Sequence, residues 1–368
     1  MVTTLSGYKD LITLLDDISN GHRLTIPETI KLFKTRDRAA FLISSYADAI
    51  REQKNGDLVT WVKNQNINCS NICVNKCGFC GFSVNPDDPR AYELDSKDIA
   101  EKAREAKNRG VTEICTVSGL HPAYNLDSYT SVYNTIRKHA PGVHIHASNP
   151  MEVAYAARKS ACSTREVLEA FKEAGVGTLC GTAAEILVDS VRNTICPDKI
   201  STSEWIKIIR ESHEIGLKST ATIMYGHCES IEDQVTHLSI LREIQDETHG
   251  FTEFVPLSFI HSGTPIYKRG QARPGATGRE DMLMIAISRL FLDNFKNIQV
   301  SWVKLGVKMV QIGLMSGAND IGGTLYEESI SQSAGAKAGE YLDPQEMNYL
   351  VTDLGRKLVQ RKTDYSFI

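Results

Sequence analysis

The sequence predicts an α/β protein whose main part is a (β/α)8 TIM-type barrel, with helical extensions at its N-terminal and C-terminal ends. Two observations predict this fold. Short apolar runs alternate with amphipathic segments along most of the chain, which is the pattern of parallel βαβ units. Eight such runs occur, and eight strands that alternate with helices are the number that closes a barrel. An open, doubly wound sheet is the alternative that the same alternation allows.

The chain is expected to have three parts: an N-terminal helical extension at 1–60, the barrel at 61–325, and a C-terminal cover segment with a helix at 326–368. In the first part, Thr25 is a candidate N-cap, followed by Pro27 in the first turn and Glu28 three positions after the cap. This arrangement predicts that a helix begins directly after Thr25.

The eight expected strands are short, apolar and bounded by polar or glycine-containing segments. They lie at 66–68, 113–117, 143–147, 178–181, 219–224, 253–257, 299–303 and 311–315. The helices between them have recognisable ends. Ser201 with Glu204 three residues later predicts a capped start, and Gly110 and Gly175 predict helix ends.

The C-terminal part has a helix of its own. Asp343 and Pro344 predict its cap and first turn, and Met347, Leu350 and Val351 belong to its apolar stripe. The preceding stretch of small residues at 329–339 is either a linker or a flexible cover over the barrel mouth.

Composition narrows the class of protein. The 368 residues are 42% hydrophobic and carry a formal net charge of −4, so there is no electrostatic reason to expect a nucleic acid or an anionic membrane as partner. No run of about 18 apolar residues predicts a membrane helix. The N-terminus lacks a basic segment followed by an apolar one, so we expect a cytoplasmic protein.

Three of the nine cysteines, Cys73, Cys77 and Cys80, lie within eight residues. A secreted disulfide framework is typical of shorter, loop-rich chains, so this cluster indicates a metal site. Zinc is the alternative, but structural zinc sites usually have four ligands in paired C-x2-C units. Three cysteines instead leave one iron of a 4Fe-4S cluster without a protein ligand. The other six are expected to be small buried hydrophobes: Cys69, Cys115, Cys162, Cys180, Cys196 and Cys228.

The cysteine segment directly follows the first expected strand. It therefore belongs at the carboxyl ends of the strands, where barrel enzymes have their active sites. Its sequence, CVNKCGFC, with Phe79 just before the last cysteine, resembles the C-x3-C-x-aromatic-C motif of the radical S-adenosylmethionine (SAM) superfamily. The resemblance implies a 4Fe-4S cluster, held by the three cysteines, and SAM as cofactors, with Phe79 beside them.

Further segments resemble the family of FO synthase second subunits, which act in the biosynthesis of deazaflavin (FO) coenzymes, and the similarity spans roughly 55–360. These segments are GTAAEIL (181–187), ICPDKISTSEW (195–205), TATIMYGH (220–227), FVPLSFIH (254–261) and GANDIGGTLYEESIS (317–331). The resemblance implies L-tyrosine and 5-amino-6-(D-ribitylamino)uracil as substrates. A 5'-deoxyadenosyl radical takes a hydrogen from the tyrosine amino group, and the Cα–Cβ bond then breaks. The 4-hydroxybenzyl group adds to the uracil, and 2-iminoacetate, 5'-deoxyadenosine and methionine are released. It also implies an external electron donor and a first subunit that completes the deazaflavin.

The chain departs from the family pattern at two positions. Gly81 follows the last cysteine, where relatives often have alanine. Ser118 and Gly119 stand where relatives commonly have two glycines, in the segment that the resemblance assigns to the amino group of SAM. A serine there still offers backbone contacts.

Other candidate residues follow the expected strands. Glu185 is a candidate for the SAM ribose and Arg192 for a carboxylate, with a surface ion pair at the barrel rim as the alternative reading of both. Tyr225 and His227 follow the fifth expected strand, where residues that face a ligand are common, although a histidine at a strand end is often purely structural.

Asn319 and Asp320 follow the last expected strand in a glycine-flanked turn. A turn-forming role is one reading, and hydrogen bonding to the edge of a uracil ring is the functional one. We expect the functional role because such a turn would face the same mouth as the cysteines.

Two other functions stay open at this point. A menaquinone-pathway enzyme that makes or cyclises a futalosine derivative would share the cysteine motif and the barrel. A non-catalytic iron–sulfur carrier or sensor would usually coordinate its cluster fully, and it would form no 5'-deoxyadenosine.

Overall fold

The computed structural model of the protein describes residues 5–368. Its N-terminal part is helical, as predicted: η1 (Leu5–Tyr8), α1 (Lys9–Ser19), α2 (Ile26–Phe33) and α3 (Ala39–Asn55). Thr25 caps α2 in a capping box with Glu28. Among the described residues, no helix is long and apolar enough to cross a membrane.

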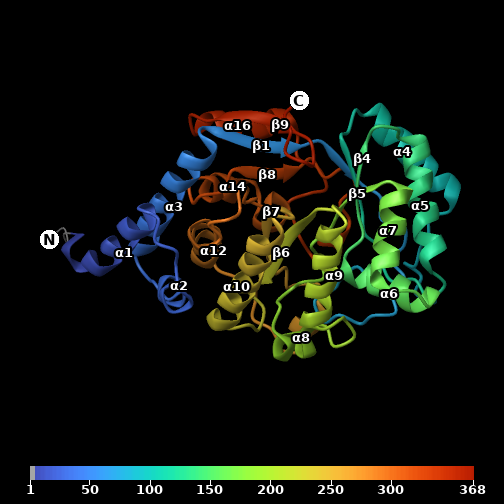
Figure 1. Ribbon diagram of the computed structural model, residues 1–368, viewed down its shortest axis with the longest axis horizontal. Coiled ribbons are helices and arrows are strands. Elements are labelled where there is room, and N and C mark those ends of the chain that lie inside the picture. The colour runs from blue at the N-terminus through green and yellow to red at the C-terminus, as the bar shows by residue number, and fades with distance from the viewer. Residues whose placement is uncertain (1–4) are drawn as a thin grey trace.

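A curved parallel sheet forms the main wall of the molecule. Within the described chain it has six strands that are neighbours in sequence order: β2 (Asn64–Asn66), β3 (Glu113–Thr116), β4 (His144–Ala147), β5 (Val176–Leu179), β6 (Ser219–Tyr225) and β7 (Phe251–Ser258). Helices cover its outer side, and Figure 1 shows the green helices α4 to α7 and the yellow-green α9 and α10 beside these strands.

A second sheet completes the wall. β1 (Leu58–Val62) lies between β8 (Asp320–Gly323) and β9 (Lys357–Arg361), with every pairing parallel. Only one residue separates β1 from β2, so together they behave as one long strand that joins the two sheets. Isolated parallel bridges link the rest: Phe254 with Ile298, Gln299 with Asp320, and Tyr326 with Gln65. These connections confirm the predicted TIM-type fold class.

The helices after α3 alternate with the strands. They are α4 (Ser96–Asn108), α5 (Leu126–His139), α6 (Pro150–Ser160), α7 (Thr164–Ala174), α8 (Asp189–Ile195), α9 (Thr202–Glu214), α10 (Ile231–Thr248), α11 (Pro265–Lys268), α12 (Gly278–Phe291), α13 (Trp302–Leu305), α14 (Val307–Leu314), α15 (Ile330–Ser333) and α16 (Pro344–Asp353). The predicted caps hold, since Ser201 accepts a hydrogen bond at the start of α9 and Gly175 ends α7 in the left-handed conformation.

The last two expected strands were wrong. Residues 299–303 contribute only isolated bridges around Gln299 before α13 begins, and 311–315 lie mostly in α14. The eighth strand of the wall is β8, whose sequence Asp-Ile-Gly-Gly looks like a turn. A short apolar run does not distinguish a strand from a buried helical turn, because four or five residues are too few to show a period.

The C-terminal strand β9 was also not predicted. It pairs with β1 and, in Figure 1, lies with α16 along the same edge of the molecule as β1. The tail therefore belongs to the wall, while α16 begins after Asp343 as predicted. The expected part boundaries at 60/61 and 325/326 stay a prediction.

Candidate functional site

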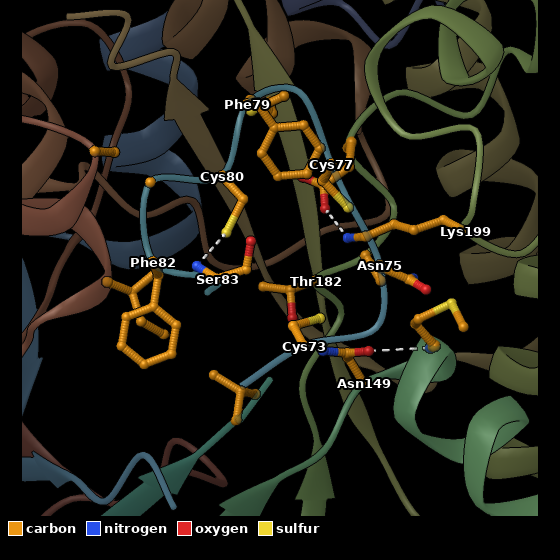
Figure 2. A pocket seen from close by; sticks show the side chains of 18 of the residues that line it. Cys73, Asn75, Cys77, Phe79, Cys80, Phe82, Ser83, Asn149, Thr182 and Lys199 are labelled. Carbon is orange, nitrogen blue, oxygen red and sulfur yellow. Dashed lines mark hydrogen bonds and ion pairs between the residues drawn. The ribbon is translucent and has the colours of Figure 1, made fainter. Parts of the chain in front are cut away.

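The cysteine loop follows β2 and lies at the carboxyl ends of the parallel strands. Cys73, Cys77 and Cys80 have free thiols, and all three line one cavity of about 260 Å³. Figure 2 shows the three side chains on the loop around this cavity. Backbone hydrogen bonds hold the loop, from Gly78 N to the Ile195 carbonyl at 2.7 Å and from Cys73 N to the Val84 carbonyl at 3.2 Å.

The electrostatic environment of these thiols fits a metal cluster. Burial raises the pKa of Cys73 and of Cys77, so neither thiol gains from ionising alone. The Lys199 ammonium opposes this effect at Cys77 and lies 5.2 Å from the centroid of the Phe79 ring. A metal ion compensates thiolates directly, so the chemistry of three clustered, partly desolvated sulfurs fits a 4Fe-4S cluster.

The segment after β3 forms the neighbouring wall. Ser118 and Gly119 line the cavity, and their assignment to the amino group of SAM stays a prediction. Gly119 N donates to the Ser70 carbonyl at 2.8 Å. A Cβ atom on Gly119 would lie 2.3 Å from the Ile72 carbonyl oxygen, so only glycine permits this approach to the cysteine loop.

The cover segment reaches the same cavity. Ile330 and Ala334 line it, which favours a cover over a linker for 329–339, and this role stays a prediction. The departure at Gly81 matters here, because a Cβ atom on this residue would lie 2.1 Å from the Ser333 carbonyl oxygen. Glycine at 81 therefore allows α15 to pack directly on the cysteine loop.

Glu152 is a cavity residue that the sequence analysis missed. It lies in the first turn of α6, is buried, and accepts hydrogen bonds from Ser118 N at 3.2 Å and Asn149 N at 3.0 Å. Burial raises its pKa to about 8. The capping box of Asn149 and Glu152 is readable from the sequence and places this carboxyl after the third strand.

Glu185 lines the cavity and forms an ion pair with Lys199, with Nζ and Oε1 2.5 Å apart. Burial lowers the pKa of Lys199, but Glu185 and Cys77 outweigh this effect and hold it above its usual value. Arg192 is placed differently. It is buried and bonds to backbone carbonyls, including that of Ile200 at 2.6 Å, and it is not among the residues that line the cavity. Neither Glu185 nor Arg192 therefore belongs to a surface ion pair at the barrel rim, which was the alternative reading of both residues.

Tyr225 and His227 do not line the cavity. The Tyr225 hydroxyl donates to Asp281 Oδ1 on α12 at 2.8 Å, and both residues are buried. His227 Nδ1 lies 3.1 Å from Glu229, whose carboxylate also accepts from His227 N at 2.8 Å. These contacts engage both side chains within the fold, and a role of either residue toward a ligand stays a prediction.

The structural premise for Asn319 and Asp320 was wrong. They lie at the amino end of β8, opposite the cavity, because the eighth strand begins at Asp320. Asp320 accepts from Arg361 Nε at 2.6 Å, and Asn319 accepts from Arg289 Nη2 at 2.6 Å. Both side chains are buried and hydrogen-bonded to arginines of the fold, so we do not propose Asn319 or Asp320 as ligands of a uracil ring.

The scattered cysteines divide into different environments. Cys69, Cys180 and Cys196 are buried as expected, whereas the expectation is wrong for Cys115 and Cys162, which are half-buried, and for Cys228, which is exposed. Cys115 and Cys180 lie with His146, and the ligand atoms of these three residues are all within 4.8 Å of one another. They come from separate strand ends, so their proximity has no signature in the sequence.

The comparisons with known proteins agree with this geometry. The radical SAM superfamily model matches residues 67–240, and the model of the CofH/MqnC C-terminal region matches residues 248–368. A 5-amino-6-(D-ribitylamino)uracil–L-tyrosine 4-hydroxyphenyl transferase of Methanospirillum hungatei JF-1 is 75% identical over 97% of this chain and 98% of its own length. The protein with the same name from Methanoculleus marisnigri is 62% identical over 96% and 97%.

Solved structures support the fold at lower identity. Methylornithine synthase is 17% identical, with a TM-score of 0.73 over 96% of this chain and 98% of that one. The FeFe-hydrogenase maturase HydG from Carboxydothermus hydrogenoformans is 13% identical, with a TM-score of 0.75 over 98% of this chain and 81% of that one.

Proposed function

The chain belongs to the radical SAM family of 5-amino-6-(D-ribitylamino)uracil–L-tyrosine 4-hydroxyphenyl transferases, and we propose that it catalyses the reaction for which these relatives are named. It is a transferase that uses a 4Fe-4S cluster and SAM. The proposed reaction joins the 4-hydroxybenzyl group of L-tyrosine to the uracil substrate and releases 2-iminoacetate, 5'-deoxyadenosine and methionine. The observation that carries the proposal is the convergence of three free thiols of one loop on a single cavity.

In this proposal Cys73, Cys77 and Cys80 hold the cluster. Three protein ligands leave one iron available to SAM, and the bound cofactors supply the 5'-deoxyadenosyl radical. Phe79 covers the cysteine loop from one side, with Lys199 over its ring. The apolar side chains of the cavity keep water away from a reactive radical, and they include Val117, Met151, Leu257 and Ile260.

The polar walls orient the substrates. Ser118 and Gly119 are proposed to contact the amino group of SAM, and Glu185 its ribose. Asn75 Nδ2 and Thr182 Oγ1 are buried in this cavity without a hydrogen-bond partner among the described residues, and such groups are costly unless a ligand satisfies them. We do not assign Arg192 to a ligand, because its guanidinium is occupied by backbone carbonyls.

The wider setting is also part of the proposal. A first subunit, another radical SAM protein, would close the product into the deazaflavin, and an external donor would reduce the cluster. A cytoplasmic location suits free thiols that must stay reduced to bind iron.

An anaerobic turnover assay tests the function. The protein is reconstituted with iron and sulfide, reduced, and given SAM, L-tyrosine and the ribityl-diaminouracil, and the products are identified by mass spectrometry. We expect a hydroxybenzyl–uracil adduct with the wild type and with the control Cys162→Ser, and none with Cys77→Ala. The appearance of 5'-deoxyadenosine without the adduct would leave a radical SAM enzyme with other substrates, such as a futalosine derivative. The absence of both from a fully loaded protein would contradict the proposal.

A further inference from the structure

Two lysines from different segments of the chain line the cavity, Lys199 and Lys304. Lys199 is already paired with Glu185. Lys304 lies in α13, directly after the segment of Gln299 that bridges to β8. Within the described part of the chain, no ion pair or hydrogen bond engages its ammonium group, although this side chain is half-buried in the cavity wall.

The two carboxylates whose charge acts on Lys304, Glu328 and Glu185, are engaged elsewhere. Glu328 accepts from Ser331 N through both of its oxygens, at 3.0 and 3.2 Å. Glu185 pairs with Lys199. Burial lowers the pKa of Lys304, and Glu328, Glu185 and Cys80 only partly offset this effect. A desolvated ammonium without a partner is unfavourable, so this position is suited to an anion that enters the cavity.

The backbone around Lys304 is firmly held. Trp302, two positions earlier, is buried, and its indole Nε1 donates to the Gly323 carbonyl at 2.9 Å. α13 is thereby fixed to β8, so the backbone that carries the lysine side chain belongs to a rigid part of the wall.

We propose that the Lys304 ammonium binds the α-carboxylate of the L-tyrosine substrate inside the cavity. This assignment rests on the proposed function. SAM also carries an α-carboxylate, but the cluster held by Cys73, Cys77 and Cys80 would supply a cationic partner for that carboxylate. The tyrosine carboxylate has none, so its burial depends on a cation supplied by the protein. Lys304 is thus a positioning residue that places the tyrosine amino group near the reacting centre.

The experiment compares tyrosine with tyramine, which has the same ring and amine but no carboxylate. Equilibrium dialysis with radiolabelled compounds is performed on the reconstituted protein, on Lys304→Met, and on the control Lys308→Met, an exposed lysine on α14. We expect the wild type to prefer tyrosine, and Lys304→Met to bind it about 10- to 100-fold more weakly, the worth of a charged hydrogen bond. Tyramine binding should be unchanged, so the preference should disappear. Lys304→Arg should keep much of it, and Lys308→Met all of it.

Other outcomes would overturn the assignment. Equal losses for tyrosine and tyramine in Lys304→Met would indicate a general packing role. A weaker affinity for SAM with unchanged tyrosine binding would assign the lysine to the SAM carboxylate. If the wild type cleaves SAM but binds no tyrosine, the proposed substrate is wrong. The wild type alone reveals that result, so it is distinguishable from an effect of the Lys304 substitution. Iron content and cluster absorbance, measured for every variant, show that each is folded and loaded.

Discussion

Glu152 shows how one buried side chain can make the stability of the protein depend on pH. Its carboxyl lies in the cavity wall and accepts two backbone hydrogen bonds, yet burial raises its pKa from 4.5 to about 8. The folded protein therefore holds a proton that the unfolded chain releases above about pH 4.5. The bound proton stabilises the folded state, and this stabilisation is fully present below about pH 4.5. It declines as the pH rises and is lost above about pH 8.

We predict that Glu152→Gln, which resembles the protonated carboxyl, removes this decline. The free energy of unfolding of the apo-protein is measured in urea from pH 5 to pH 8 for both proteins, and the wild-type value minus the variant value should fall across this range. Parallel pH profiles of the two proteins would contradict the prediction.

Gly119 illustrates a position where the backbone itself is the constraint. The atom that a Cβ would meet is the Ile72 carbonyl oxygen at 2.3 Å, and a backbone group cannot move aside as a flexible side chain does. We predict that Gly119→Ala displaces the cysteine loop and lowers stability by about 1–3 kcal/mol, the usual cost of overpacking. Iron bound per chain and the unfolding midpoint measure both effects.

The control for this variant is Gly278→Ala. A Cβ on Gly278, at the start of α12, meets no atom within 4 Å, so this change should be neutral or slightly stabilising. Normal iron loading in Gly119→Ala would show that the loop tolerates the displacement.

At the scale of elements, β9 and the tail after it close the amino end of the barrel. Arg361 on β9 is buried and donates to Asp320 at 2.6 Å and to Glu253 at 3.2 Å. The Tyr365 hydroxyl also donates to Glu253, at 2.6 Å, and Thr363 donates to Glu113 at 2.7 Å. The last residues thus supply the partners of carboxylates from three strands of the wall.

We predict that Arg361→Met destabilises the protein by about 3–5 kcal/mol, because it leaves buried carboxylates without their cation. The control is Lys357→Met on the same strand, an exposed residue whose loss should change stability by less than about 0.5 kcal/mol. Urea unfolding of both variants gives the two values, and equal values would contradict a special role of the tail.

At the scale of the whole molecule, the two ends of the barrel have different tasks. The carboxyl ends carry the cysteine loop, Glu152 and the lysines of the cavity, whereas the amino ends carry the ionic network of the tail. The wall between them is held by neutral buried histidines. His237 on α10 accepts a hydrogen bond from Leu187 N at 2.9 Å and donates one to the Thr222 carbonyl at 3.0 Å. The two bonds join α10 to the segment after β5 and to β6.

We predict that acid weakens the whole fold through these histidines. Burial lowers the pKa of His237 from 6.5 to about 3 and that of His213 to about 4. The stability they contribute is present above pH 6.5 and is lost as the pH falls toward these values, because the unfolded chain then binds more protons. The free energy of unfolding of the wild type minus that of His237→Asn should decrease as the pH is lowered from 7 to 4.5. The exposed His249→Asn should keep the wild-type slope.

The sequence by itself determined the class of fold and the chemistry of the cysteine loop. Strand and helix patterns are local, and Cys73, Cys77 and Cys80 lie within eight residues, so their common cavity needed no long-range information. Their role as cluster ligands stays a prediction. The tertiary structure alone decided features that depend on residues far apart in the chain. It placed Asp320 beside Arg361, brought Lys304 and Lys199 to the same cavity, and buried Glu152 within hydrogen-bond distance of Ser118 N. The physical reason is that burial and charge pairing arise from contacts between distant segments, which no local pattern of residues records.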